Sequence, residues 1–252
     1  MLALVREVSP QLARCELTHL ARESIDAARA ARQHQGYTQA LQALGCVLEW
    51  LPPLPDHPDG VFVEDTAVAL PEIAVVTRPG ASSRRGETAS VAVALERHAR
   101  VARMTEPACL DGGDVLHIGR TFHVSTSGRT NAAGVAQLAQ RLTPYGYRVQ
   151  AVAVEGCLHL KSAASYIPPD VLLVNPEWVD PAAFGELRVI AVDAREPYAA
   201  NTLSIGGTTL LSAAYPETLR RLAAAGIRTH AVDVSELHKA EGALTCMSLL
   251  LG

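Results

Sequence analysis

A strand–strand–helix–strand pattern recurs along the whole chain, and this repeat limits the fold more than any other feature. Hairpin turns at 71–72, 119–120 and 168–169 follow one another at spacings of 48 and 49 residues. A fourth turn at 206–207 comes 38 residues later, and the two ends of the chain together supply a fifth unit. Repeats of this length are typical of radial arrays, in which each unit packs against its neighbours.

Short β-branched and apolar runs predict the strands, and apolar residues at helical spacing predict the helices. Asn131 is expected to cap the helix that follows it, and Gly226 to terminate the helix before it. The expected strands cover 66–70, 73–77, 101–104, 115–118, 122–125, 147–154, 171–174, 187–192, 202–205, 208–212, 228–232, 244–250, 2–6 and 47–51. The expected helices cover 22–44, 87–100, 131–142, 181–184 and 216–225.

Neither a linker nor a low-complexity segment interrupts this pattern, so we expect a single domain over residues 1–252. The five units favour a closed radial α/β array. An ordinary open α/β sheet is the alternative that the pattern alone leaves open.

Composition excludes several classes of function. There are 22 Lys and Arg against 26 Asp and Glu, and no basic run exceeds two residues, so we expect no nucleic-acid partner. The longest apolar stretches are far shorter than the ~20 residues of a membrane span. The N-terminus lacks the apolar core of a signal peptide, which favours a cytoplasmic protein with reduced thiols. The five cysteines form no C-x-x-C pair, so a zinc ribbon is excluded.

Unusual polar residues fall at the same phase of the five repeats, just before or within the first strand of each. They are Glu64 and Asp65, Asp111 and Asp114, His159, Asn201, and Cys246. Taken one at a time, each has an ordinary structural explanation. In a radial array, however, equivalent positions converge on the axis, so carboxylates, a histidine, an amide and a thiol are expected at one catalytic mouth. Cys246, His159 and Asp111 are also conceivable zinc ligands, but their spacing lacks paired ligands, and we expect no metal site.

Six motifs in order resemble the dimethylarginine dimethylaminohydrolase family, of the pentein or guanidino-group-modifying superfamily, over almost the whole chain. They are PDGVFVEDT at 58–66, TRPGASSRRGE at 77–87, LDGGDVL at 110–116, GRTN at 128–131, LHLKS at 158–162 and LTC at 244–246. The resemblance implies a pentein fold, that is, a five-bladed α/β propeller of ββαβ units with its active site at the centre. It implies hydrolysis of Nω-methylated L-arginines, asymmetric dimethylarginine or monomethylarginine, to L-citrulline plus dimethylamine or methylamine. The implied partner is a small guanidino amino acid, no cofactor is implied, and a monomer or homodimer is expected.

The resemblance also assigns roles to ten residues. Cys246 matches the nucleophile, His159 the general acid/base, and Asp111 the carboxylate that orients the histidine. The matched substrate contacts are Glu64 and Asp65 for the guanidinium, Arg84 and Arg129 for the α-carboxylate, Asp59 for the amino-acid end, Ala240 for a backbone carbonyl facing the substrate amine, and Leu17 for a mobile lid loop.

These residue types suit the implied chemistry. Carboxylates are the natural bidentate partners of a planar guanidinium, and arginines bind a carboxylate better than lysines do. The guanidinium carbon is a poor electrophile, so a covalent route through a cysteine thiolate, forming a thiouronium, is expected. Nearby carboxylates should raise the pKa of Cys246 in the free enzyme, and a bound cation should lower it again.

Three alternatives stay open. An arginine deiminase, acting on unmethylated arginine or a related guanidino compound, usually carries an Asp two residues after the histidine, where this chain has Lys161, and is usually longer. An agmatine deiminase would not need Arg84 and Arg129 as carboxylate ligands. A non-catalytic pentein binding protein is the remaining alternative, and it would have lost the nucleophile and base that Cys246 and His159 supply.

Overall fold

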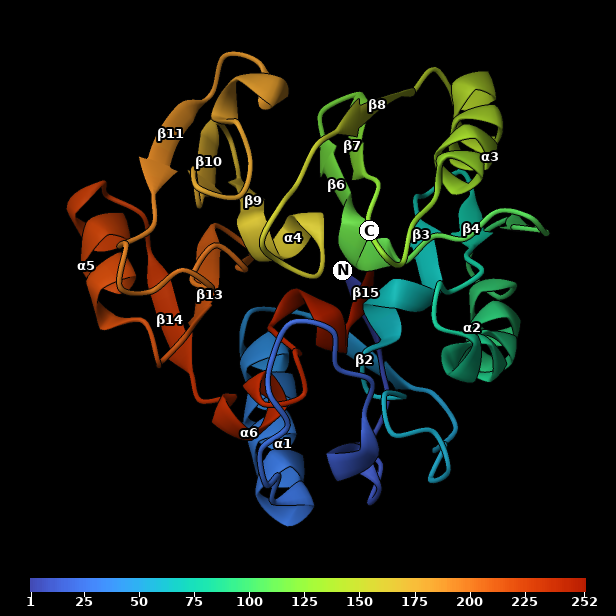
Figure 1. Ribbon diagram of the computed structural model, residues 1–252, viewed down its shortest axis with the longest axis horizontal. Coiled ribbons are helices and arrows are strands. Elements are labelled where there is room, and N and C mark those ends of the chain that lie inside the picture. The colour runs from blue at the N-terminus through green and yellow to red at the C-terminus, as the bar shows by residue number, and fades with distance from the viewer.

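The computed structural model describes residues 1–252, and its strands form five three-stranded sheets around a common centre (Figure 1). The sheets have the orders β15-β1-β2, β3-β4-β5, β6-β7-β8, β9-β10-β11 and β12-β13-β14. The strands are β1 (Leu2–Val5), β2 (Val47–Trp50), β3 (Ala67–Ala69), β4 (Ala74–Val76), β5 (Val101–Arg103), β6 (Val115–Ile118), β7 (Thr121–Ser125), β8 (Arg148–Val152), β9 (Ala164–Ile167), β10 (Val171–Val174), β11 (Arg188–Ala191), β12 (Leu203–Ile205), β13 (Thr208–Ser212), β14 (Thr229–Val232) and β15 (Leu249–Leu251). The helices are α1 (Ala27–Ala43), α2 (Thr88–Leu95), α3 (Ala132–Leu142), α4 (Leu160–Ala163), α5 (Pro216–Ala224) and α6 (Ser235–His238).

Every sheet has the same internal topology. Its middle strand pairs antiparallel with the first strand and parallel with the third, and a helix or a 3-10 turn connects the middle strand to the third. In one sheet the first strand is β15, from the end of the chain, paired with β1, from its beginning. The two ends therefore close the ring, and the predicted radial array of five units is confirmed.

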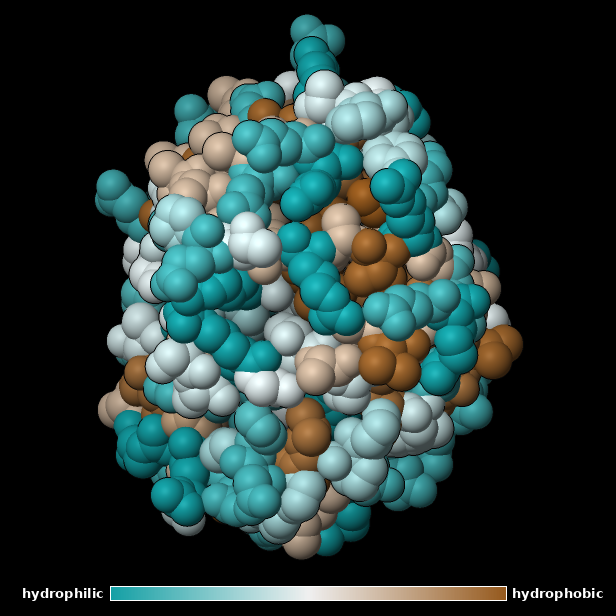
Figure 2. All heavy atoms as spheres, turned by 90° about the vertical axis from the view of Figure 1, so that its right-hand side faces the viewer, coloured by the Kyte–Doolittle hydropathy of each residue, from teal (hydrophilic) through white to brown (hydrophobic).

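Burial explains why these sequences form blades. The middle strands β4, β7 and β10 are buried at every position, whereas the third strands β2 and β11 are largely accessible. Five hydrophobic clusters hold the ring, and each lies between two adjacent blades. Burial of apolar surface is thus distributed around the ring. On the face that carries α2 and α3, hydrophobic side chains lie in small groups among hydrophilic ones (Figure 2).

Several local predictions are confirmed and two helix boundaries are wrong. Asn131 caps α3 by accepting a 2.8 Å hydrogen bond from the Gly134 N–H, and Gly226 has the left-handed φ of 80° expected after a helix. The helix expected over 22–44 begins only at Ala27, where Asp26 caps it. The helix expected over 87–100 ends at Leu95, because the Arg97 and His98 N–H groups bond to carbonyls three residues back and tighten the chain into turns.

The strand expected over 244–250 is wrong in its first half. Residues Thr245–Met247 form a 3-10 turn, and the strand begins at Leu249. The Thr245 N–H bonds to the side chain of Asn201 rather than to a neighbouring strand, which prevents a β-ladder here. Short helical turns also precede the first strands of three other blades, at Val63–Thr66, Gly112–Asp114 and Leu160–Ala163. These turns bring the polar residues of the repeats to the axis.

Candidate active site

A small cavity of about 20 Å³ lies where these turns meet. Seven of the predicted site residues line it: Asp59, Asp65, Arg84, Arg129, His159, Ala240 and Cys246. Glu16, Phe62, Leu158, Glu241 and Gly242 complete its wall. Such a volume holds about one water molecule, so the cavity as it stands is too small for an amino acid. Asp111, Glu64 and Leu17 lie outside this lining and are described in turn below.

Cys246 lies on the 3-10 turn Thr245–Met247, and only 9% of the residue is exposed. Burial raises the pKa of its thiol, and the carboxylates of Glu64 and Asp65 raise it further, while Lys161 acts in the opposite direction. This is the direction that the sequence predicts for the free protein. The remaining cysteines are also free thiols, and none of them lines this cavity.

His159 immediately precedes α4, and its side chain faces two carboxylates. Its Nε2 lies 3.4 Å from Asp111 Oδ2, and its Nδ1 lies 4.0 Å from Asp65 Oδ1. Burial alone would lower the pKa of His159, but Asp65, Asp114 and Asp111 outweigh it and raise the pKa to about 9. The imidazole is therefore protonated at neutral pH, as a general acid must be before it can act.

Asp111 is fully buried behind the histidine, outside the cavity lining. Its Oδ1 accepts a hydrogen bond of 2.9 Å from the Gly80 N–H, which leaves Oδ2 facing His159. Gly113 explains how the ring and the carboxylates approach so closely. A Cβ on Gly113 would lie 2.5 Å from His159 Nδ1, so the site requires glycine at this position.

Arg84 is buried and almost fully engaged by the chain itself. It donates to both oxygens of Glu87, at 3.2 and 3.0 Å, to Asp65 Oδ2 at 2.6 Å and to the Phe62 carbonyl at 2.9 Å. Burial lowers its pKa, but Glu87 and Asp65 outweigh this and hold the pKa above its usual value. Of the five N–H groups of its guanidinium, one on Nη1 is left to face a ligand.

Arg129 is freer, and it reaches the loop that covers the cavity. Its Nη2 donates to Thr18 Oγ1 at 3.1 Å, and its Nη1 lies 3.9 Å from Asp111 Oδ2. Asp59 accepts a 3.1 Å hydrogen bond from the Glu16 N–H of the same loop. Burial raises the pKa of Asp59 to about 6, against the opposing effect of the Arg84 charge, so its carboxylate is ionised at neutral pH.

Leu17 belongs to this loop, next to Glu16. Its side chain is half-buried and packs against the hydrophobic cluster that includes Ala240 and Cys246. The side chain therefore anchors the loop to the core. A direct substrate contact of Leu17, as the resemblance implies, stays a prediction.

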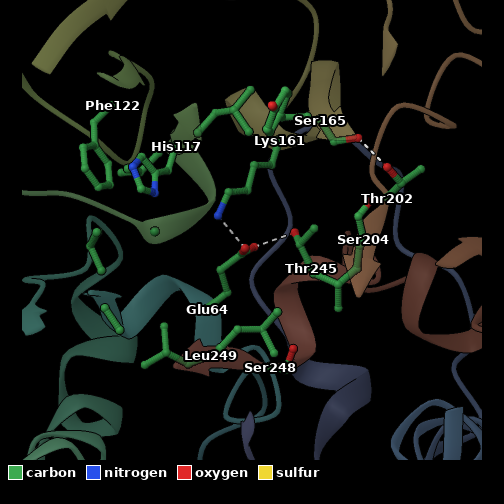
Figure 3. Close-up of a pocket in the computed structure, with 18 of the residues that line it drawn as sticks. Glu64, His117, Phe122, Lys161, Ser165, Thr202, Ser204, Thr245, Ser248 and Leu249 are labelled. Atoms are coloured by element: carbon green, nitrogen blue, oxygen red, sulfur yellow. Dashed lines mark hydrogen bonds and ion pairs between the residues drawn. The ribbon is translucent and has the colours of Figure 1, made fainter. Parts of the chain in front are cut away.

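Glu64 faces away from the small cavity, although its neighbour Asp65 lines it. Glu64 lies at a second cavity of about 380 Å³, which shares no lining residue with the first. Its Oε1 accepts from Lys161 Nζ and its Oε2 from Thr245 Oγ1, both at 2.6 Å (Figure 3). Burial raises the pKa of Glu64 in spite of the Lys161 charge. Both of its oxygens are engaged by the chain, and its guanidinium contact stays a prediction.

Glu64 belongs to a ring of hydrogen bonds across the axis. Thr245 Oγ1, which donates to Glu64, accepts from Asn201 Nδ2 at 3.0 Å, and Asn201 Oδ1 accepts from the Thr245 N–H at 3.0 Å. Asn201 Nδ2 also donates to the Lys161 carbonyl at 3.1 Å. The ring joins four blades and fixes the turn that carries Cys246.

One cluster has the donor atoms to hold a metal ion. The ligand atoms of Asp65, Asp111 and His159 lie within 4.8 Å of one another. However, Asp65 already binds the Arg84 guanidinium, and His159 has a pKa of about 9. A metal ion would have to displace a proton and compete with a buried arginine, so the charges present favour the predicted metal-free site.

Four residues of the site region carry roles that local sequence reasoning missed. They are Glu87, Thr245, Lys161 and Glu241. Each acts through a side-chain contact that depends on the folded chain, and Thr245 binds Glu64 from 181 positions away. Of these four residues, only Lys161 could have been connected with the site from the sequence, because it follows His159 by two residues.

Comparisons with known proteins find relatives of the chain in both sequence and structure. None of the models of known protein families matches the chain. The chain is 43% identical over 252 residues to the N(G),N(G)-dimethylarginine dimethylaminohydrolase of Streptomyces coelicolor, covering 99% of this chain and 96% of that one. It is 37% identical over 226 residues to the protein of the same name from Pseudomonas aeruginosa, covering 89% of each chain. A solved structure of the Pseudomonas aeruginosa enzyme, a cysteine-to-serine mutant complexed with citrulline, superposes with a TM-score of 0.94 and 34% identity over 98% of both chains.

Proposed function

The chain belongs to the dimethylarginine dimethylaminohydrolase family, and from this premise we propose that it hydrolyses Nω-methylated L-arginines to L-citrulline and the corresponding methylamine. Residues 1–252 would act as one catalytic domain, with Cys246 as the nucleophile. None of the helices is both long and apolar enough to cross a bilayer. The pentein architecture of five ββαβ blades is shared with the solved relatives.

One observation carries the proposal: a single small cavity is lined by a thiol, a protonated histidine and charges of both signs. Asp65 supplies negative charge near Cys246 and His159, where a guanidinium would lie. Arg129 supplies positive charge, and Asp59 negative charge, for the two ends of an α-amino acid. A methylarginine carries the complementary charges, so its binding would pair each of these groups.

The first half-reaction would form a covalent intermediate. In our mechanism the bound guanidinium lowers the pKa of the Cys246 thiol, which releases its proton to solvent, and the thiolate attacks the guanidinium carbon and forms a C–S bond, giving a tetrahedral adduct. Protonated His159 then donates its proton to the methylated nitrogen, the C–N bond breaks, and dimethylamine or methylamine leaves. The remaining group is a thiouronium on Cys246. The raised pKa of His159, about 9, supports the acid role, because the proton is in place beforehand.

The second half-reaction would release citrulline. The now neutral His159 takes a proton from water, and the resulting hydroxide attacks the thiouronium carbon. The C–S bond breaks and the Cys246 thiolate is regenerated. The hydroxyl group loses its proton as the carbonyl of citrulline forms, and the released amine takes up that proton. Asp111 would hold the imidazole through both steps, because its Oδ2 faces Nε2 at 3.4 Å.

A citrulline assay tests the proposal directly. Asymmetric dimethylarginine, monomethylarginine and arginine are incubated in parallel with the protein, with Cys246→Ser and with Cys46→Ser. Cys46 is buried but lies outside the cavity, so it serves as the matched control. We expect citrulline from the methylated substrates with the protein and with Cys46→Ser, and none with Cys246→Ser. Turnover of arginine alone, or full activity of Cys246→Ser, would contradict the proposal.

The same assay decides the alternative of an arginine deiminase. Lys161 stands where such enzymes usually carry an Asp, and its Nζ binds Glu64 at 2.6 Å. The chain therefore offers no second carboxylate there for the unmethylated nitrogens of arginine. This supports the methylated substrates over arginine itself.

A further inference from the structure

The loop over the active-site cavity is the part of its wall best able to move. Residues 15–26 contain neither a helix nor a strand and are mostly exposed, whereas the other walls come from buried turns. The cavity of about 20 Å³ is far too small for a methylarginine. Substrate can therefore reach Cys246 only if a wall opens, and ligand-binding segments are commonly the least stable parts of a fold.

Glu241 holds this loop through three consecutive backbone groups. Its Oε2 accepts from the Thr18 N–H at 2.9 Å, and its Oε1 accepts from the His19 and Leu20 N–H groups at 2.5 and 2.6 Å. Hydrogen bonds to an ionised carboxylate are stronger than those between neutral groups. In Figure 1 the loop after β1 arches beside the segment between α6 and β15, where Glu241 lies.

The backbone of Glu241 adopts an unusual conformation that directs its carboxylate toward the loop. Glu241 is the only residue other than glycine with a positive φ, at 56°. Its own N–H bonds to the His238 carbonyl at 3.0 Å, which fixes it to the end of α6. A left-handed conformation is strained for a residue other than glycine, and such strain tends to mark functional positions. Glu241 thus joins a fixed helix end to an exposed loop.

The loop and Glu241 also contact each group expected at the amino-acid end of the substrate. Thr18 accepts from Arg129, and the Glu16 N–H donates to Asp59. Ala240 immediately precedes Glu241 in the cavity wall. Release of the loop would therefore disturb Arg129, Asp59 and Ala240 together. It would leave Cys246 and His159 on their separate turns.

We infer that Glu241 is a positioning residue that latches the loop 15–26 shut over the bound amino acid through the Thr18, His19 and Leu20 N–H groups. The inference rests on the proposed function for the identity of that amino acid. Loss of the latch should weaken binding of the amino-acid end without slowing the chemistry at the guanidinium. A role in folding alone would instead lower activity on every substrate equally.

The test compares Glu241→Gln and Glu241→Gly with Asp180→Asn. Glycine removes the carboxylate and keeps the left-handed backbone, so this variant separates the latch from misfolding. Asp180 also accepts a backbone N–H, from Ala182 at 2.9 Å, in a distant blade, and so controls for loss of one loop carboxylate. Amide hydrogen exchange is measured on the ligand-free proteins. We expect exchange of the three latched amides to rise about tenfold or more in both Glu241 variants and to stay unchanged in Asp180→Asn.

Kinetics provide the second arm. The KM for asymmetric dimethylarginine should rise roughly tenfold in the Glu241 variants with kcat within about twofold, because the loop contributes binding rather than chemistry. N,N-dimethylguanidine lacks the amino-acid end, so its turnover should be unchanged. Alkylation of Cys246 by iodoacetamide should accelerate in both variants. Unchanged exchange at the three amides, or an equal loss of activity on both substrates, would overturn the inference. The exchange and alkylation measurements need no turnover, so they decide the latch even if no methylarginine is hydrolysed.

Discussion

Replacing Arg84 by methionine is expected to destabilise the fold far more than the same replacement at Arg129. The sequence predicts one role for both residues, but their surroundings differ. The Arg84 side chain is 4% exposed and binds Glu87, Asp65 and the Phe62 carbonyl, whereas Arg129 is 11% exposed and has one hydrogen bond shorter than 3.5 Å. Removal of Arg84 would leave two buried carboxylates without their shared cation.

The size of the difference follows from these contacts. Breaking a buried ion pair by removing one partner costs about 3–5 kcal/mol. For a protein of this length, this corresponds to a fall in Tm of roughly 6–20 °C. Arg129→Met breaks a hydrogen bond from a charged group to Thr18, worth about 1.5–3 kcal/mol, and a longer ion pair of 3.9 Å with Asp111, so its fall in Tm should be smaller, roughly 3–12 °C. Arg129→Met should instead raise the KM for a methylarginine roughly 10- to 100-fold, because a charged contact to the α-carboxylate is lost.

Thermal unfolding and steady-state kinetics of both variants make the comparison. Circular dichroism melts at pH 7 give Tm, and urea titrations give the free energy of unfolding with a check that the slope is unchanged. Equal Tm values for Arg84→Met and the wild-type protein would refute the reasoning that the Glu87–Arg84–Asp65 group is structural. A large loss of stability in Arg129→Met with no change in KM would refute the assignment of Arg129 to binding.

Three further outcomes are expected. Burial raises the pKa of Asp59 to about 6, so its carboxylate becomes protonated and loses its charge as the pH falls through 6. The KM for a methylarginine should therefore rise below pH 6, and Asp59→Asn should remove this pH dependence. Burial also raises the pKa of the Cys246 thiol, so its alkylation by iodoacetamide in the free protein should still be accelerating above pH 9, and a plateau below the ~8.5 of an ordinary cysteine would contradict this. Gly113→Ala should lower kcat about 100-fold by displacing the His159 ring, whereas Gly36→Ala, with no atom within 4 Å of the added Cβ, should leave kcat unchanged.

Most of the blade architecture could be predicted from local sequence, because its determinants are local. The strand over Val115–Ile118 and the cap at Asn131 depend on apolar runs and on a side chain that bonds within its own turn. The middle strands β4 and β10 are buried at every position, so they read as continuous apolar segments. Helix ends were less predictable. The end of α2 at Leu95 depends on a change to tighter turns that the apolar spacing does not signal.

The site could be predicted as a set of residues but not as an arrangement. Cys246 and His159 occupy equivalent positions in their repeats, which indicated that they converge on the axis. The 3-10 turn that carries Cys246, however, depends on a hydrogen bond between Thr245 and Asn201, which are 44 positions apart in the chain. The adjacent positions of Glu64 and Asp65 in the sequence did not indicate that their side chains lie at different cavities. Glu64 and Asp65 lie at different cavities because the 3-10 turn Val63–Thr66 points their side chains apart.

The charges of the free site explain why the proposed reaction would begin only after substrate binds. Burial acts to raise the pKa of Asp65, but the positive charges of His159 and Arg84 outweigh it and lower the pKa to about 2. His159 carries a proton up to a pH of about 9, so the negative charge beside Cys246 is already balanced by the protein's own cations. A thiolate in this site would add a buried charge without a partner, so the thiol keeps its proton. A bound guanidinium supplies the missing positive charge, which lowers the thiol pKa at the moment when the protonated His159 is needed as an acid. The raised pKa values of Cys246 and His159 therefore serve one purpose: both protons are held until the cationic substrate is enclosed.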